Sequence, residues 1–293
     1  MLSLHTNAAA LSAQNSISRT QDNLSTSMTR LSTGFRINSA MDDAAGLQIA
    51  TRLKAQTSGM AVAMRNTQNS ISMMQTAEGA LDETSNILVR MKDLATQAAD
   101  GSSTDADRTA MQAEYDSLTN ELTNIFGNTK FGGTSLFNST DGKLIAAITF
   151  QIGADMSETM DADFTGELTA ASGSILTAAA GFDSTGATPI TALGAVITTD
   201  TAANTAIGNL TTAIDDVATL RSKLGAVSNR LDHVYNNLSN ISTNTKTATG
   251  RIMDVDFASE SASMTSSQML LQAGTAMLKQ SNSQSSLVLS LLQ

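Results

Sequence analysis

Few residues in this sequence are of the types that carry acid–base or metal chemistry. The two histidines, His5 and His233, lie in distant segments, and neither a cysteine nor a His-Glu-x-x-His motif is present. We interpret His233 as a structural residue beside a core position of a helix. Asp42 and Asp43 are adjacent carboxylates, but neighbouring residues on a helix point about 100° apart and do not face one another. The sequence therefore predicts a protein that is not an enzyme and has no catalytic residues, metal or cofactor.

One stretch, LSTGFRINSAMDDAAGLQIATRL (residues 31–53), gathers charges and turn-forming residues between two helical patterns. Gly34 is expected to end the first helix, because glycine enters the left-handed C-cap conformation at little cost. Asn38 or Ser39 is expected to cap the helix that follows. The stretch therefore predicts a break between two helices.

The charges of this stretch allow two interpretations. Asp42 and Asp43 would lie in or just before the first turn of the second helix, where they favour the positive end of the helix dipole. Arg36 is near enough to pair with them or with a neighbour. The simpler interpretation is a well-capped helix break. The alternative is a joint between two structural layers, in which the residues that set the register between neighbouring copies are Gly34, Arg36, Asn38, Asp42 and Asp43.

Long helices must position this stretch, and heptad spacing predicts them. Apolar and small residues step by three and four along three segments, which keeps one helix face against a partner. The first series is Met74, Ala77, Leu81, Thr84, Leu88, Met91, Ala95 and Ala98. The second is Met111, Tyr115, Leu118, Leu122 and Ile125, and the third is Val217, Leu220, Leu224, Val227, Leu231, Val234, Leu238 and Ile241. We predict helices over residues 44–99, 105–127 and 201–249, the first of them roughly 80 Å long.

The region between the second and third helices is patterned differently. Residues 126–143 form a cluster of glycine and asparagine turns, and ITFQI (residues 148–152) is typical of a strand. Residues 156–200 are rich in Gly, Ala, Ser and Thr, and we expect only short strands and loops there. Residues 128–200 are thus predicted to be a small β and loop region.

Both ends of the chain are apolar. Residues of the N-terminal segment recur at heptad-like spacing, and QMLLQAGTAML (residues 268–278) is apolar almost all round. Such a helix needs burial on every side, and burying one Leu or Met contributes roughly 1.5–3 kcal/mol. We expect the ends to wrap each other or to pack among copies of the chain. The residues expected in this packing are Leu24, Met28, Leu31, Leu270, Leu271, Met277 and Leu278.

Composition excludes several classes of protein. The net charge is −10 and the sequence pI about 4.5, with no basic patch, which disfavours nucleic-acid binding. No apolar run approaches the roughly 18 residues of a membrane span. The N-terminus lacks the pattern of a Sec signal peptide. The absence of cysteine fits either a cytosolic protein or one exported unfolded.

Several motifs together resemble bacterial flagellin. LSTGFRINSAMDDAAGLQIATRL is similar to the N-terminal signature of that family, and NTQNSISMMQTAEGALDETSNIL, DLATQAADGSSTDADR and FQIGADM continue the resemblance. RSKLGAVSNRLDHVYNNLSNI and AGTAMLKQSN resemble its C-terminal signature. The likeness covers about residues 1–155 and 205–293. FGG replaces the usual Phe-Asn-Gly, the last residue is Gln293 where many members have arginine, and the middle is too short for the family's large outer domains.

The resemblance implies a mainly α fold, an elongated rod of long antiparallel coiled-coil helices with a small β-hairpin region. Residues 1–42 and 251–293 would pair as inner-core helices, and residues 43–250 would form the rod. It also implies unfolded export through a flagellar type III channel and an extracellular place in the bacterial flagellum, where the chain would form a helical filament used for motility. The implied partners are identical copies, hook-associated and cap proteins, and an export chaperone that would bind residues 264–292 as a helix in a groove.

The family is also sensed by an animal Toll-like receptor, and the resemblance carries that contact to LVRMKDLATQ (residues 88–97) and Glu114. Arg90, Leu94 and Glu114 match the family positions. The stretch departs from the usual family sequence at Val89, Lys92 and Asp93. In the alternative interpretation, Arg90 and Glu114 are ordinary surface charges of the rod.

Two other functions compete with the filament subunit. A hook–filament junction protein of the flagellum shares similar ends, but the intact RINSAMDDAAGL and LGAVSNRL favour the filament subunit. A signalling coiled coil, such as a chemoreceptor hairpin, would have mirrored helices at a tip and a membrane segment, and the sequence has neither pattern. The leading hypothesis is therefore a structural protein that polymerises through contacts that do not close into a ring.

Overall fold

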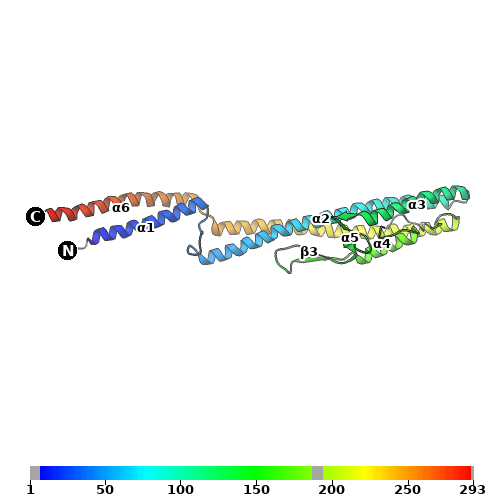
Figure 1. The fold of residues 1–293 in the computed structure, drawn as a ribbon, viewed down its shortest axis with the longest axis horizontal. Coiled ribbons are helices and arrows are strands. Elements are labelled where there is room, and N and C mark those ends of the chain that lie inside the picture. Colours follow the sequence, from blue (N-terminus) through cyan, green and yellow to red (C-terminus); the bar gives the residue numbers. More distant parts are fainter. Residues whose placement is uncertain (1–6, 187–193, 292–293) are drawn as a thin grey trace. The chain divides into compact units, whose positions relative to one another are not determined.

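The structure is a computed structural model that describes residues 7–186 and 194–291, and it is mainly helical (Figure 1). The chain divides into two compact units. Unit 1 comprises Met1–Thr57 and Thr243–Gln293, and unit 2 comprises Ser58–Ser242. The predicted fold class, long helices with small β-hairpins, is confirmed. Within the described ranges, no helix is both long enough and apolar enough to cross a membrane.

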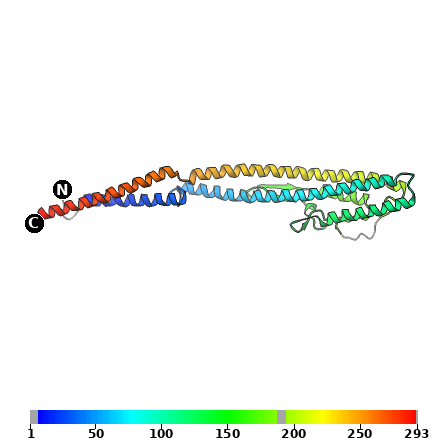
Figure 2. The same cartoon turned by 90° about the horizontal axis from the view of Figure 1, so that it is seen from above.

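Unit 1 is built on a pair of helices. α1 (Ala8–Thr33) and α6 (Phe257–Leu291) lie side by side in both Figure 1 and Figure 2. Their facing side chains recur every three or four residues and are partly or fully buried, which is the geometry of a coiled-coil seam. On α1 the seam is Ala10, Ala13, Ile17, Thr20, Leu24, Ser27 and Leu31, and on α6 it is Glu260, Met264, Ser267, Leu271, Gly274, Leu278 and Ser281.

Small residues hold this seam in register. A Cβ atom at Gly274 would lie 2.9 Å from Cγ1 of Ile17, so the glycine leaves the space that the isoleucine fills. Arg30 of α1 pairs with Glu260 of α6 at 3.7 Å. At the other end of the pair, the Asn7 amide nitrogen donates to the Ser281 hydroxyl at 3.2 Å. The sequence of the two ends therefore specifies one alignment of α1 against α6.

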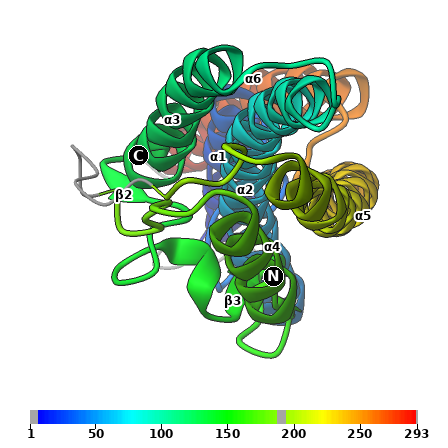
Figure 3. The same cartoon turned by 90° about the vertical axis from the view of Figure 1, so that its right-hand side faces the viewer.

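Unit 2 contains most of the lengths of α2 (Ala44–Ala98) and α5 (Asp200–Met253), which run antiparallel there. α3 (Asp105–Asn128) and α4 (Thr165–Ala178) pack beside them, and Figure 3 looks along this bundle with α3, α4 and α5 grouped around α2. Arg221 of α5 pairs with Glu78 and Asp82 of α2 at 2.7 and 2.8 Å.

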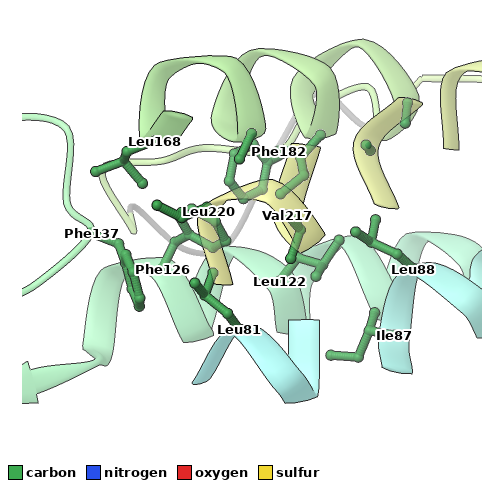
Figure 4. Close-up of a cluster of buried hydrophobic side chains, with 14 of the residues drawn as sticks. Leu81, Ile87, Leu88, Leu122, Phe126, Phe137, Leu168, Phe182, Val217 and Leu220 are labelled. Carbon is green, nitrogen blue, oxygen red and sulfur yellow. The ribbon is translucent and has the colours of Figure 1, made fainter. Parts of the chain in front are cut away.

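The core of unit 2 follows the predicted heptads. All eight residues of the first series are buried, with at most 1% exposure, which confirms that series. Leu81, Leu122 and Leu220 meet from α2, α3 and α5, and Phe126 stacks edge-on against Phe182 with ring centroids 5.1 Å apart (Figure 4).

The third series departs from the heptad at its end, where Ile241 is 38% exposed. The buried position after Leu238 is Ser242, four residues on rather than three. The prediction that Ile241 belongs to the buried stripe is wrong. The reason is that the next inward-facing position was misplaced by one residue, which turns the side chain by about 100° around the helix.

The connecting region contains two small hairpins. β1 (Lys130–Phe131) pairs antiparallel with β2 (Thr134–Ser135), within the predicted cluster of turns. After a short 3-10 helix, η1 (Lys143–Ile145), β3 (Ile148–Gln151) pairs antiparallel with β4 (Thr159–Ala162), with Phe150 opposite Met160. The strand predicted at ITFQI is therefore confirmed.

The expectation that residues 156–200 form only strands and loops is wrong, because α4 lies there. Its sequence, TGELTAASGSILTA, contains two glycines and several β-branched or hydroxyl residues, which lower helix propensity. Helical spacing nevertheless places Leu168, Ala171, Ile175 and Ala178 on one face, and all four are buried. Burial of this face against the bundle outweighs the weak local preference.

Candidate assembly site

The predicted joint in unit 1 is made of two connectors that pair with each other. Residues 34–43 link α1 to α2, residues 254–256 link α5 to α6, and we call these two connectors the joint. The Val255 N–H donates to the Gly34 carbonyl at 3.0 Å, and the Arg36 N–H donates to the Met253 carbonyl at 2.6 Å. Phe35 and Asp254 form an antiparallel bridge between these bonds. The ends of all four helices are therefore held together by backbone hydrogen bonds.

Gly34 ends α1 as expected. Its φ is 76°, in the left-handed region, and its N–H donates to the Arg30 carbonyl at 2.9 Å. The atom nearest to a Cβ built on this glycine is Cζ of Phe257, at 3.9 Å, so space is available for a side chain. The backbone conformation, and not crowding, is what requires glycine here.

Replacing Gly34 with alanine should destabilise the helix pair of unit 1 by about 1–2 kcal/mol, because an L-residue is strained in the left-handed region. Chemical unfolding followed by hydrogen exchange along α1 measures this. Gly79→Ala is the matched control, because Gly79 is an exposed residue inside α2 with open space around its Cα. That change should stabilise the protein by about 0.5–1 kcal/mol. Equal effects of the two substitutions would contradict this account.

The two aspartates of the joint have different roles. The Asp43 carboxylate accepts from the Gly46 N–H at 2.8 Å and so caps α2, which begins at Ala44. The Asp42 carboxylate lies outside the helix and accepts from the N–H groups of Asn38 and Ser39, at 3.1 and 2.8 Å. It stabilises the loop and does not cap the helix.

The expectation that Asn38 or Ser39 caps the next helix is therefore wrong. Both residues lie too far before Ala44, since a capping side chain reaches only the second or third residue of the helix. The Asn38 amide instead donates to the Phe35 carbonyl at 2.9 Å, and the Ser39 hydroxyl donates to Asp42 at 3.1 Å. Both residues order the loop that precedes the cap.

Hydrogen bonds from the Ser39 backbone, and then from the Asn38 backbone, hold the pKa of the Asp42 carboxyl below its ordinary value. A carboxylate with a lowered pKa stabilises the fold above its unfolded pKa of about 4, and this contribution is lost as pH falls through the folded pKa. We expect the hydrogen-exchange protection of the Asn38 and Ser39 amides, corrected for intrinsic rates, to fall severalfold below about pH 4. In Asp42→Asn the protection should be lower and independent of pH. An unchanged pH profile in the variant would exclude Asp42 as the cause.

Arg36 links the first connector of the joint to the end of α5. Its guanidinium donates through Nη2 to the Ile252 carbonyl at 2.9 Å. Carbonyls at the C-terminal end of a helix carry partial negative charge, which a cation stabilises. The Arg36 side chain thus points to the end of α5 and not to Asp42 or Asp43, and its pairing with a neighbour stays a prediction.

The residues expected in terminal packing fall into two groups. Leu24, Leu31, Leu271 and Leu278 are half-buried in the seam between α1 and α6. The others are exposed: Met28 by 55%, Leu270 by 58% and Met277 by 67%. These three are not buried in the seam, so for them only the second alternative, packing among copies of the chain, stays as a prediction.

An exposed apolar strip runs along α6 beside the seam. Leu270 and Met277 each precede a seam leucine by one residue, so they point about 100° away from α1. Met269 is 61% exposed, and Ala273 and Ala276 are exposed as well. At helical spacing these residues share one face. We call Met269, Leu270, Ala273, Ala276 and Met277 the outer stripe.

On unit 2, the residues matched to receptor recognition are also separated. Arg90 and Glu114 are about half-exposed and form an ion pair, with Nη2 and Nε of Arg90 at 2.6 and 2.9 Å from the Glu114 Oε1. Leu94 is only 3% exposed and belongs to the core. The expectation that Leu94 lies on the same surface is therefore wrong, because its side chain belongs to the main hydrophobic core of unit 2.

The residues first considered for chemistry are not gathered into a site. His233 is exposed on α5, and His5 lies outside the described residues. Across residues 7–186 and 194–291, no group of three or more His, Cys, Asp or Glu side chains is arranged to hold a metal ion.

Sequence reasoning missed the second connector of the joint. Asp256 caps α6 by accepting from the Ala258 N–H at 3.1 Å and from the Ser259 hydroxyl at 2.8 Å. An aspartate just before a run of small helical residues is an N-cap signal and was available in DVDFASES. The pairing of this connector with residues 34–36 had no local signal, because it joins segments more than 200 residues apart.

The fold and the joint define a class of protein in which the two ends of one chain pair as helices and two long antiparallel helices carry the core. The model of the bacterial flagellin N-terminal helical region matches residues 4–141, and the model of the flagellin C-terminal helical region matches residues 207–292. Together they cover most of the chain. The chain belongs to the bacterial flagellin family.

Similar proteins agree with this membership. The chain is 47% identical over 173 residues to the B-type flagellin of Pseudomonas aeruginosa, covering 59% of this chain and 35% of that protein. It is 50% identical over 159 residues to polar flagellin B/D of Vibrio parahaemolyticus, covering 54% of this chain and 41% of that protein. The matched part is thus less than half the length of these relatives.

A solved structure assigned to a flagellar hook-associated protein from Vibrio parahaemolyticus aligns with a TM-score of 0.54 at 18% identity. The alignment covers 73% of this chain and 100% of that one. At this identity the likeness supports the fold alone.

Proposed function

We propose that this protein is a structural subunit that self-polymerises into the helical filament of the bacterial flagellum. The single observation that carries the proposal is the outer stripe of α6, which is apolar and exposed in a chain of the flagellin family. Leaving such a surface in water is unfavourable, and burying each large side chain contributes roughly 1.5–3 kcal/mol. Other copies of the chain are the partners proposed to cover it.

The proposed contact is heterologous. The outer stripe of one copy packs on a different surface of the next copy, so the contacts continue as a helix and do not close into a ring. The α1 surface has an open groove of about 460 Å³, lined by Leu24, Met28 and neighbouring polar residues, and it is proposed to receive the apolar side chains of the next copy. Repetition of one such contact generates a filament.

In the proposed filament, residues 1–42 and 251–293 are the inner-core helices, and residues 43–250 are the rod. The joint passes between these layers and supplies Gly34, Arg36, Asn38, Asp42 and Asp43 to set the register of neighbouring copies.

The remaining proposals come from the family. The chain is exported unfolded through the flagellar type III channel, and its apolar C-terminal segment binds an export chaperone before assembly. Hook-associated and cap proteins contact the filament ends outside the cell. Arg90 and Glu114 supply an exposed charged pair for a Toll-like receptor, a contact to which the buried Leu94 does not contribute directly.

Electron microscopy of the purified chain, seeded with flagellar filament fragments, tests the proposed function. Long growth from the seeds supports the filament subunit. Short additions that stop after a layer would instead indicate the hook–filament junction protein, and no addition at all would overturn the proposal. The junction function is not favoured, because the curated relatives named above are flagellins.

A further inference from the structure

The methionines of this chain differ sharply in exposure. The chain has 15 methionines. In unit 2, Met74 and Met91 are at most 1% exposed. In the helix pair of unit 1, Met28, Met269 and Met277 are 55%, 61% and 67% exposed. The exposed thioethers of this pair are therefore open to reagents that the buried ones do not meet.

We propose that Met28, Met269 and Met277 form an oxidation site at which peroxides control self-assembly, an inference that rests on the proposed filament function. The reagent class is a hydroperoxide, with hydrogen peroxide as the simplest member. A lone pair of the thioether sulfur attacks one peroxide oxygen, an S–O bond forms and the O–O bond breaks. The sulfur loses two electrons, and the peroxide is reduced to water, which keeps both protons. Oxidation at sulfur follows exposure, so these residues react ahead of the buried core.

The position of these sulfurs determines the effect of oxidation. Met269 and Met277 belong to the outer stripe, and Met28 lines the groove of α1. A sulfoxide is polar, and burying it without a hydrogen-bond partner is unfavourable. A second copy of the chain, whose apolar side chains must cover the outer stripe, therefore binds the oxidised surface more weakly.

The seam between α1 and α6 is expected to survive oxidation. The three methionines are exposed outside it, and the one methionine among the seam residues named above, Met264, is half-buried. Oxidation should thus weaken assembly and leave the helix content of the chain unchanged. General damage to the fold would reduce both assembly and helix content.

The first test maps the modification on the purified full chain treated with hydrogen peroxide. Peptide mass spectrometry should find sulfoxide at Met28, Met269 and Met277 while Met74 and Met91 stay reduced. In the polymer, Met28, Met269 and Met277 should be oxidised roughly tenfold more slowly than in the unassembled chain, because a neighbouring copy covers them. Equal rates in both states would overturn the proposal.

The second test measures the critical concentration for polymerisation by sedimentation, with helix content followed by circular dichroism. Oxidation should raise the critical concentration of the parent chain by roughly tenfold or more. The variant M28L/M269L/M277L should assemble and resist peroxide, since leucine conserves volume and apolarity. The control Met156→Leu changes a methionine that is 93% exposed in unit 2, and it should remain as sensitive as the parent.

Repair gives a result that does not depend on the leucine variant. Methionine sulfoxide reductases of both stereospecificities, supplied with a dithiol, should restore assembly of the oxidised parent chain. Two results would overturn the oxidation site and leave the proposed function standing. One is loss of assembly in the peroxide-treated leucine variant, and the other is loss of assembly in the oxidised parent that repair does not reverse. Failure of the untreated parent chain to polymerise would overturn both.

Discussion

Deleting residues 264–293 should abolish polymerisation and leave unit 2 folded. The deletion removes the whole outer stripe and the seam leucines Leu271 and Leu278. The main core cluster extends only from Ile71 to Leu231, so it loses none of its members. Sedimentation should show the truncated chain as unassembled at every concentration tested. Circular dichroism should show a loss of helix signal. This loss should be no larger than that expected from removing residues 264–293 and unfolding α1, which loses its partner helix.

A finer pair of variants separates the outer stripe from the seam. The variant M269S/L270S/M277S removes the exposed apolar side chains, and we expect the critical concentration to rise roughly a hundredfold or more. The control Q268S/Q272S/Q280S changes exposed polar residues of the same helix and should assemble normally. Polymers that form as readily from the first variant as from the control would exclude the outer stripe as the assembly surface.

Replacing Leu220 with alanine should lower the free energy of unfolding of unit 2 by about 2–5 kcal/mol. Leu220 is fully buried on α5, among side chains from α2 and α3 (Figure 4). The loss combines the missing apolar burial with the cavity that remains. Urea unfolding measures this loss in the free energy of unfolding, and thermal unfolding should show a clear decrease in the melting temperature.

Leu176→Ala is the matched control, because Leu176 is 53% exposed on α4. An exposed leucine leaves no cavity, so this change should alter the stability by roughly 0.5 kcal/mol or less. A control as damaging as Leu220→Ala would mean that burial in the bundle is not what stabilises unit 2.

The long helices could be predicted because burial repeats along them. Leu81 and Leu88, seven residues apart, both reach the core, and heptad spacing is readable without any knowledge of the partner helix. α4 could not be found in this way. It is short and rich in small residues, and two of the four residues on its buried face are alanines, so its helical spacing is a weak signal.

The site shows the same division between local and distant information. Gly34 could be predicted as a helix end because its conformation is a local property. The partner of Arg36 is a carbonyl of the distant residue Ile252, so no nearby pattern indicated it. Met277 and Leu278 are adjacent in the sequence and both are apolar. Only the seam with α1 decides that Met277 is exposed and Leu278 is half-buried.

Sedimentation velocity of the intact chain across a wide range of concentrations is the decisive measurement of self-assembly. It should show unassembled chain below a critical concentration and large polymers above it, since the outer stripe is covered only by other copies. A chain that stays monomeric at the highest concentration, with both terminal helices ordered, would exclude the outer stripe as an assembly surface.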